Sequence, residues 1–548
     1  MKDAKMIFQP CDILKETEIF ATVESVSAGR GTLRLGVLCP PSDIEWKQLV
    51  IGYTYKIESD REDYLVEPVS VSENGFGILL EFVIDAEAFP FKPTNWTVRI
   101  AGDKDGEKYA ARIQYTQFRL TPEELLAGQY RCTDSKGHLL YAHRVRGSYL
   151  GLRYREMTPY DDMKIKKREV KAQALAKKNK KELERKDICL IYEKKCAKAQ
   201  DNAYYLFKYC MDNDMESYLG KSIYYVITED SPDRKKLEPY ANNLIIFGST
   251  KHMEYMLAST LLISADSKSH GYIWQYDRSI IGNKMGEKRF IFLGHGVLAL
   301  KKLNDSFPAE RMNAVLTTVT SDAEADIVIR ELGYTKSQAV VTGYARFDAL
   351  EDKSQDYREI LIMPTHRKWL FGVDRTTFME SEYYRRYMEL INSPELTALL
   401  RENDLTANFY LHPSICEHFD AFSSSDDRVK LVPMGSVPLD DLLMKCRLLV
   451  SDYSSVCWDL YYMGKPAVFY QYDVPEYMDT WGSYIDLEKD TPGPRAEELG
   501  ELIEHIRGSI ERGFKLDDYW ASKREQHFRY IDRDNCKRIC EVIKERGL

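Results

Sequence analysis

Four segments of the chain combine the pattern of a buried strand with polar side chains where that strand ends. In the first, Phe290–Leu293 leads into Gly294-His295-Gly296. An imidazole ionises near neutral pH, so His295 is a candidate general base. The flanking glycines would let a ligand approach the backbone closely, which makes Gly296 a candidate binding position. The alternative interpretation is a structural histidine at a turn.

The second segment places a hydroxyl and a guanidinium after a strand. Ile360–Met363 is followed by Pro364, Thr365, His366 and Arg367. The fork of donors on Arg367 suits phosphate oxygens, and Thr365 adds a hydroxyl. Both are therefore candidates for substrate binding, although an ordinary surface arginine after a strand is the competing interpretation.

The third segment ends in a histidine whose backbone is restricted. Asn408–Leu411 runs into His412-Pro413. Because proline confines the preceding residue to extended geometry, the direction of the chain at His412 is set. His412 is thus a second candidate catalytic group, with a capping histidine as the alternative.

The fourth segment is the most informative of the set. Leu448–Ser451 continues into Asp452-Tyr453-Ser454-Ser455, and Asp459 follows in the expected helix. Ser454 and Ser455 would lie at a helix N-terminus, where free N–H groups and the dipole favour an anion. Capping alone needs one serine, so this cluster suits a nucleotide diphosphate better. No Walker A sequence or G-x-G-x-x-G follows these strands, so ATPase, kinase and dinucleotide-oxidoreductase functions lack their motif.

The elements that position these residues belong to an α/β region beginning at Asp187. Apolar, β-branched runs alternate with helical stretches, as in buried parallel strands. A first series of runs ends near Thr342 and a second begins at Ile360, with a long helical stretch at Glu382–Arg401. The pattern predicts two Rossmann-like domains that divide near residues 351–354, with ligands beyond the carboxyl ends of the strands.

The amino-terminal region, from about residue 17 to 158, is typical of β structure. Thr32–Val37, Trp96–Ile100 and Tyr109–Ile113 alternate with period two and are separated by turn residues. We predict an antiparallel all-β domain, a sandwich or a barrel, that carries no catalytic group.

A strongly basic segment, Lys164–Lys186, joins the two regions. It holds eleven Lys and Arg residues against three Glu residues, and its composition favours a helix. One interpretation is a solvated helical linker. The other is a surface that binds anionic lipid mainly through charge. Nucleic acid is not expected, because no aromatic residues interleave the basic ones.

Composition restricts the class of protein. The 548 residues are 44% hydrophobic and 30% charged, with a net charge of −9, as in soluble globular proteins. No apolar run approaches the roughly 18 residues that span a bilayer, and no signal-peptide core follows the first residues. Eleven cysteines lack ligand spacing and indicate free thiols in a reducing cytoplasm, with a disulfide framework or a zinc site as the alternative. We therefore expect neither a secreted nor an integral membrane protein.

With these motifs in order, the last 260 or so residues resemble the CDP-glycerol glycerophosphotransferase family, whose members build teichoic-acid and related polyol-phosphate polymers. The resemblance rests on Gly294-His295-Gly296, Thr342–Asp348, Pro364–Arg367, Leu411–Pro413, Ser451–Ser455 with Asp459, Gly464–Pro466 and Phe469–Asp473. It implies a GT-B-like pair of Rossmann-like domains with the active site between them.

The resemblance also implies a reaction. An acceptor hydroxyl would attack the phosphorus that bears the alditol of a CDP-alditol donor, CMP would leave, and His295 would take the proton. The pyrophosphate would be held by His412, Arg367, Ser454 and Ser455. Arg346 and Asp452 are second-tier candidates for the site. The acceptor would be a lipid-linked glycan or a polyol phosphate, at the cytoplasmic face of the membrane. No metal site or cofactor is expected, with Mg²⁺ as the alternative.

The sequence departs from the family pattern at three points. Val297–Lys301 replaces the usual Thr-Pro-Leu-Lys, His366 stands where Trp is usual, and Ala345 where Pro is common. These departures bear on the acceptor and the alditol more than on the reaction class. A glycosyltransferase that uses a nucleotide sugar, and a non-catalytic polymer-binding protein, are the alternatives.

The predicted domains are a β-rich domain (1–160), a basic helical linker (161–187), an acceptor-side Rossmann-like domain (188–350) and a CDP-alditol-side domain (351–548). The terminal helices are expected to cross back from the last domain to the third.

Overall fold

The computed structural model describes residues 14–54, 61–115, 121–145, 148–272, 279, 281–304 and 306–548. The chain divides into two units. The first comprises residues up to 178 with residues 248–257 and 273–285, and the second comprises residues 179–247, 258–272 and 286–548. These units differ from the predicted domains, because the expected linker of residues 161–187 is divided between them. The two Rossmann-like domains together form the second unit.

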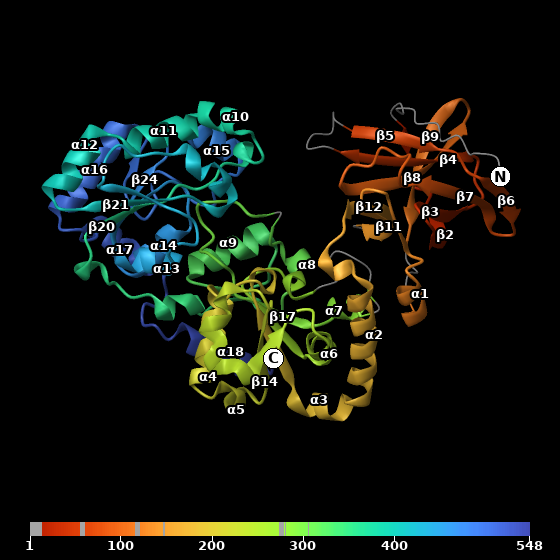
Figure 1. Cartoon of the computed structure of the whole chain (residues 1–548), viewed down its shortest axis with the longest axis horizontal. Coiled ribbons are helices and arrows are strands. Elements are labelled where there is room, and N and C mark those ends of the chain that lie inside the picture. The colour runs from red at the N-terminus through yellow and green to blue at the C-terminus, as the bar shows by residue number, and fades with distance from the viewer. Residues whose placement is uncertain are drawn as a thin grey trace. The chain divides into compact units, whose positions relative to one another are not determined.

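In the first unit, the described strands form one connected sheet of twelve strands around an apolar core (Figure 1). Leu33, Leu35 and Val37 alternate inward on one strand, which explains the period-two pattern. Most pairings are antiparallel, as predicted, but β1 and β2 both pair with β9 in parallel. The strands are β1 (Lys15–Glu16), β2 (Ala21–Ala28), β3 (Thr32–Cys39), β4 (Glu45–Thr54), β5 (Arg61–Val66), β6 (Ser70–Asn74), β7 (Gly77–Asp85), β8 (Thr94–Lys104), β9 (Glu107–Gln114), β10 (Arg131–Thr133), β11 (His138–Val145) and β12 (Tyr149–Glu156).

The basic segment forms two helices, α2 (Met163–Lys178) and α3 (Lys180–Lys186), that separate at Asn179. One side of α2 is buried within the first unit: Lys166 and Glu169 are 2% and 1% exposed. The Glu169 carboxylate accepts a hydrogen bond from the backbone N–H of Ile281 at 3.2 Å. The segment predicted as a solvated helical linker is therefore helical, and one side of α2 is packed rather than solvated.

The second unit contains a first parallel sheet whose strand order is β15-β14-β13-β16-β17-β18-β19. This is the order of a Rossmann sheet, with the chain reversing direction across the sheet between β13 and β16. All five residues of Ile188–Tyr192 are buried, as expected of a central parallel strand. The strands are β13 (Ile188–Tyr192), β14 (Ser222–Ile227), β15 (Leu244–Ile246), β16 (Leu261–Ser264), β17 (Arg289–Phe292), β18 (Leu316–Val319) and β19 (Ala339–Val341).

A second parallel sheet of the same unit repeats this order as β22-β21-β20-β23-β24-β25. Its switch point lies between β20 and β23, the strands that precede Thr365 and Asp452. The predicted helical stretch at 382–401 is two helices, because Pro394 starts a new one after the Ser393 cap. The elements are β20 (Glu359–Ile362), α11 (Glu382–Ile391), α12 (Pro394–Glu402), β21 (Thr406–Tyr410), β22 (Val429–Val432), β23 (Cys446–Ser451), α14 (Val456–Tyr462), β24 (Ala467–Tyr470) and β25 (Arg495–Ala496).

The terminal helix α18 (Asn535–Glu545) returns to the first parallel sheet. Cys536, Ile539, Cys540 and Ile543 lie in one apolar cluster with residues of β13, β14 and α4 (Asn202–Asp212). The parallel α/β architecture expected from the sequence is thus present in both halves of this unit. No helix within the described ranges is long and apolar enough to cross a membrane.

Candidate functional site

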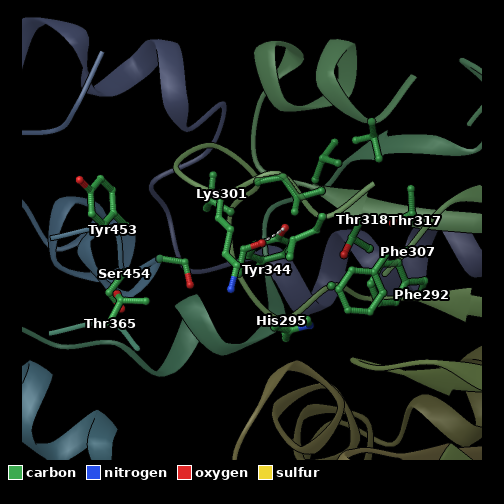
Figure 2. A pocket seen from close by; sticks show the side chains of 18 of the residues that line it. Phe292, His295, Lys301, Phe307, Thr317, Thr318, Tyr344, Thr365, Tyr453 and Ser454 are labelled. Atoms are coloured by element: carbon green, nitrogen blue, oxygen red, sulfur yellow. Dashed lines mark hydrogen bonds between the residues drawn. The ribbon is translucent and has the colours of Figure 1, made fainter. Parts of the chain in front are cut away.

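A cavity of about 250 Å³ lies in the second unit, at the carboxyl ends of strands from both parallel sheets. Six of the ten predicted site residues line it, and four do not. In Figure 2, Thr365, Tyr453 and Ser454 lie at one side, and Phe292, Phe307 and Thr317 at the other, with Lys301 and His295 between them. The predicted residues that line the cavity are His295, Gly296, Thr365, His412, Ser454 and Ser455.

His295 is exposed at the end of β17 and contacts Phe307 edge to face, with 5.1 Å between the ring centroids. Gly294 has φ +66°, a conformation that favours glycine. Gly296 approaches the second sheet closely, because a Cβ added there would lie 2.8 Å from the Ser455 hydroxyl. The two glycines therefore have separate roles: one makes the turn and the other lets the His295 loop reach the opposite wall.

Two buried polar side chains fix this loop. The Asn202 amide, at the start of α4, donates to the Gly294 carbonyl at 2.8 Å. The Glu324 carboxylate accepts from the Leu298 N–H at 2.8 Å and from the Tyr344 hydroxyl at 2.8 Å. Burial raises the pKa of Glu324, and these hydrogen bonds oppose that shift. His295 thus projects from a backbone that is held on both sides.

Three hydroxyls of the opposite wall, and one amine from the loop after His295, also line the cavity. Thr365 is 6% exposed, and its buried hydroxyl has no hydrogen-bond partner in the part of the chain that the structure describes. Ser454 and Ser455 lie just before and at the N-cap of α14, and Ser455 makes no side-chain cap hydrogen bond. Lys301 comes from the loop after His295; burial, then Lys368 and Arg367, lower its pKa to about 8. These groups can all donate to an anion.

His412 meets a second imidazole, that of His366. Their Nδ1 atoms are 3.0 Å apart and their ring centroids 4.2 Å apart. Both rings line the cavity. Burial, His412, Lys301 and Arg367 lower the pKa of His366 to about 3. Burial and Lys301 lower the pKa of His412 to about 4, against an opposing effect of Asp452.

Arg367 does not line the cavity. Its guanidinium is fully buried and bonds to Asp473 at 2.6 Å, to Asp452 at 2.8 Å and to the Thr365 carbonyl at 2.7 Å. Asp452 also accepts from the Thr365 N–H at 2.8 Å. The substrate contacts predicted for Arg367 and Asp452 are therefore replaced by a charge cluster that holds Thr365 in place.

Arg346 and Asp459 are likewise paired with each other rather than facing the cavity. The guanidinium binds the Asp459 carboxylate at 2.7 and 3.1 Å and lies 3.5 Å from Asp201. Asp201 caps α4 of the first sheet, whereas Asp459 belongs to α14 of the second. The structure thus gives these two predicted binding residues a joining role between the two Rossmann-like domains.

The chemistry of the lining suits an anion better than a metal. No Asp or Glu appears among the described residues that line the cavity. Nor do the described ranges contain a group of three metal-ligating side chains. Mg²⁺ prefers carboxylate and other oxygen ligands, so a protein-held Mg²⁺ site does not fit this lining.

Sequence reasoning missed Lys301, His366, Glu324 and Tyr453 as contributors to the site. Lys301 and His366 were visible only as departures from the family pattern, and a Lys after the Gly-His-Gly turn was the available signal. Glu324 lies one turn into α9 (Asp322–Leu332), and nothing in the local sequence relates it to the His295 loop 26 residues before.

A family model described as CDP-Glycerol:Poly(glycerophosphate) glycerophosphotransferase matches residues 132–545 of the chain. The chain is 28% identical over 381 residues to the minor teichoic acid biosynthesis protein GgaB of Bacillus subtilis (strain 168). This alignment covers 66% of this chain and 40% of GgaB. It is 27% identical over 220 residues to a teichoic acid glycerol-phosphate transferase of Staphylococcus aureus (strain NCTC 8325 / PS 47), over 38% of this chain and 55% of that protein.

The chain therefore spans about half or less of the length of these relatives. Among solved structures, the wall teichoic acid polymerase TagF, soaked with CDPG, matches with a TM-score of 0.50 at 15% identity. The match covers 71% of this chain and 99% of that chain. At this identity the likeness shows a shared fold.

Proposed function

Because the chain belongs to the CDP-glycerol:poly(glycerophosphate) glycerophosphotransferase family, we propose that it transfers glycerol phosphate or ribitol phosphate from a CDP-alditol to an acceptor hydroxyl and releases CMP. The acceptor is a lipid-linked glycan or a polyol-phosphate chain of teichoic-acid type. One observation carries the proposal. One cavity is lined both by the exposed imidazole of His295, which follows a strand of the first sheet, and by the hydroxyls of Thr365, Ser454 and Ser455, which follow strands of the second.

The reaction follows from that arrangement. The acceptor oxygen attacks the phosphorus that bears the alditol, and the bond from that phosphorus to the oxygen of CMP breaks. His295 takes the proton of the attacking hydroxyl, an effect typically worth about 10²- to 10⁴-fold in rate. Its exposure leaves the imidazole free to meet an acceptor that enters from outside.

The donor's diphosphate occupies the opposite wall. The hydroxyls of Thr365, Ser454 and Ser455 and the amine of Lys301 donate to its oxygens, and His412 lies beside them. These groups are fixed before the reaction, so they stabilise the charge that develops on CMP without reorganising. Arg367 and Asp452 hold the Thr365 backbone, and Arg346 with Asp459 keeps the two walls together.

Calorimetric titration with CDP-glycerol, CDP-ribitol, UDP-glucose and CMP tests the donor, because binding does not require the acceptor. We expect one CDP-alditol to bind best and EDTA to leave that binding unchanged. Preference for UDP-glucose would instead indicate a sugar transferase, and no binding at all would contradict the catalytic role.

The base is tested by measuring donor binding and turnover separately in His295→Ala. We expect donor affinity within about threefold of wild type and turnover lowered about 10²-fold or more. Undiminished turnover would contradict the assignment, and a loss of donor binding would move His295 to the donor site.

A second part of the proposal is that α2 binds the anionic cytoplasmic surface of the membrane and makes this a peripheral protein. Nine of the eleven Lys and Arg residues in 164–186 are exposed. Four of them recur on one face of α2, opposite the buried Lys166 and Glu169. Each basic residue near such a surface contributes about 1 kcal/mol. These four are Lys164, Lys167, Lys171 and Lys178.

Sedimentation with phosphatidylglycerol vesicles tests this. Wild-type protein should sediment at low salt and dissociate as salt rises, and changing the four lysines to Gln should weaken sedimentation markedly. A matched control changes four exposed lysines elsewhere to Gln and should sediment like wild type. Equal loss in both variants would point to net charge alone. The control lysines are Lys336, Lys430, Lys515 and Lys537.

A further inference from the structure

Lys301 brings to the cavity an amine that has no anionic partner of its own. It lines the cavity and is half-buried, and within the described ranges its Nζ makes no hydrogen bond and no ion pair. Figure 2 shows Lys301 between the two walls. A cation that is withdrawn from water without a counter-ion is costly unless another group stabilises it. In this structure an aromatic ring takes that place.

The ring is that of Trp481, which presents its face to the Lys301 amine. Nζ lies 3.4 Å from the ring centroid, the geometry of a cation–π interaction. Trp481 follows α15 (Val474–Thr480) and is not among the described residues that line the cavity. Its indole N–H is buried and has no hydrogen-bond partner in the described part of the chain. The ring therefore acts through its face, and it reaches the cavity by way of Lys301.

The backbone on both sides of Lys301 is bound to the same segment. The Ala299 carbonyl accepts a hydrogen bond from the Tyr484 N–H at 2.9 Å, and the Lys302 N–H donates to the Gly482 carbonyl at 3.0 Å. Although Lys301 belongs in sequence to the first Rossmann-like domain, its loop is thus held by residues of the second. Its amine is therefore positioned by the domain that carries the donor wall.

We propose that Trp481 is a positioning residue that acts through Lys301. Its ring holds the ammonium group at the cavity before the donor arrives, so the diphosphate meets a cation whose place is already set. Such preorganisation lowers the ordering cost that a free lysine side chain would bear on binding. This inference rests on the proposed function, since the diphosphate of the donor is the ligand concerned.

The charge on Lys301 gives the interaction a pH dependence. Burial, then Lys368 and Arg367, lower the pKa of Lys301 to about 8, and a bound dianion raises it. Donor affinity should therefore be highest below about pH 8 and fall as pH rises above it, because the free protein loses the proton that the complex retains. Two histidines also face Lys301. They are His366 and His412, whose pKa values of about 3 and about 4 leave them neutral throughout this range.

A double-mutant cycle separates a role through Lys301 from a merely structural one. Donor affinity is measured by calorimetry at about pH 7 in wild type, Trp481→Leu, Lys301→Met and the double variant. Trp369→Leu is the matched control, because Trp369 is 41% exposed and is not among the described cavity residues. Urea midpoints establish that each variant folds. If the midpoint of Trp481→Leu falls, Trp481→Met, a more adaptable side chain without a ring, takes its place in the cycle.

We expect Trp481→Leu and Lys301→Met each to weaken donor binding about tenfold, and the double variant to bind no more weakly than Lys301→Met. Trp481→Phe keeps a ring face and should stay within about threefold of wild type, as should Trp369→Leu. Raising the pH from about 7 to about 9.5 should weaken binding in wild type but not in Lys301→Met.

Three results would overturn the proposal: an unchanged affinity in Trp481→Leu, additive losses in the double variant, or a wild-type affinity that ignores this change of pH.

Failure of the proposed function has a different signature. If wild type binds no CDP-alditol, the same cycle is run with dimethyl diphosphate, a diester with one methyl group on each phosphorus. Losses of affinity that are shared between Trp481→Leu and Lys301→Met would sustain the positioning role for a diphosphate ligand. Additive losses, or no binding of this ligand, would overturn it.

Discussion

At the scale of single residues, Arg367 shows how a charge can serve the site without touching a ligand. Its guanidinium lies between Asp452 and Asp473, which follow β23 and β24, while its own segment follows β20. Two tyrosine hydroxyls complete the cluster: that of Tyr387 donates to Asp452 at 3.1 Å, and that of Tyr453 donates to Asp473 at 3.2 Å. Three strand ends are therefore tied at one point beneath Thr365.

Arg367→Met should destabilise the second unit by about 3–5 kcal/mol, because it leaves two carboxylates buried without a cation. The urea midpoint of the full chain measures the loss. Ser454→Ala is the comparison and should keep the wild-type midpoint while weakening donor binding. If Arg367→Met kept the wild-type urea midpoint but lost donor affinity, the result would instead support a phosphate-binding role for Arg367.

Gly296→Ala should reduce turnover about tenfold or more, because the added Cβ would lie 2.8 Å from the Ser455 hydroxyl and displace the His295 loop. Gly286→Ala is the control, since an added Cβ there meets nothing within 4 Å. Steady-state rates of both variants test this, and equal rates would mean that the loop accommodates the methyl group.

At the scale of elements, α18 is part of the first parallel sheet's core although it comes last in the chain. Asn535 donates to the Asp348 carboxylate at 2.7 Å, and its own side chain fills the space beside Gly343, where a Cβ would lie 1.9 Å from Oδ1. The apolar face of α18 then covers α4 and the sheet. The helix is fixed at its first turn and along its length.

Ile539→Ala on α18 should therefore cost about 2–5 kcal/mol of stability, the usual loss for a buried isoleucine. Lys537→Ala, exposed on the same helix, should stay within about 0.5 kcal/mol of wild type. Urea unfolding followed by tyrosine and tryptophan fluorescence compares them, and similar midpoints for the two would show that α18 adds little to this core.

At the scale of the whole molecule, Arg346 joins the two Rossmann-like domains through Asp201 on one side and Asp459 on the other. Burial raises the pKa of Asp459, and Arg346 counteracts that shift. A carboxyl whose folded pKa exceeds its unfolded value destabilises the protein while ionised, and the penalty disappears as pH falls through the folded pKa.

Arg346→Met should accordingly be much less stable than wild type at about pH 8, and the difference should narrow toward about pH 5 as Asp459 becomes protonated. Adding Asp459→Asn to Arg346→Met should remove much of this pH dependence. Urea midpoints across the range measure both variants, and a deficit independent of pH would contradict the proposed cause.

The fold was largely predictable because buried parallel strands are continuous apolar runs, and Ile188–Tyr192 and Ala467–Tyr470 appear as such. Strand β18 is not recognisable as such a run because two threonines interrupt its apolar character, and β25 is not because it has only two residues. The site was predictable where a residue acts at its own strand end, as with His295 and Ser454. The role of a residue was not predictable where it depends on a partner that is distant in sequence, as Arg367 depends on Asp473.

The return of α18 to the first sheet has a consequence for the order in which the protein matures. The two apolar clusters that pack on the second parallel sheet draw on residues between 297 and 528, all of which precede α18 in the chain. The core of the first Rossmann-like domain includes Cys536, Ile539, Cys540 and Ile543, although its strands emerge from the ribosome earlier. At about 5–20 residues per second, those strands wait on the order of tens of seconds for their last helix. The half of the cavity that carries His295 is thus encoded first and completed last.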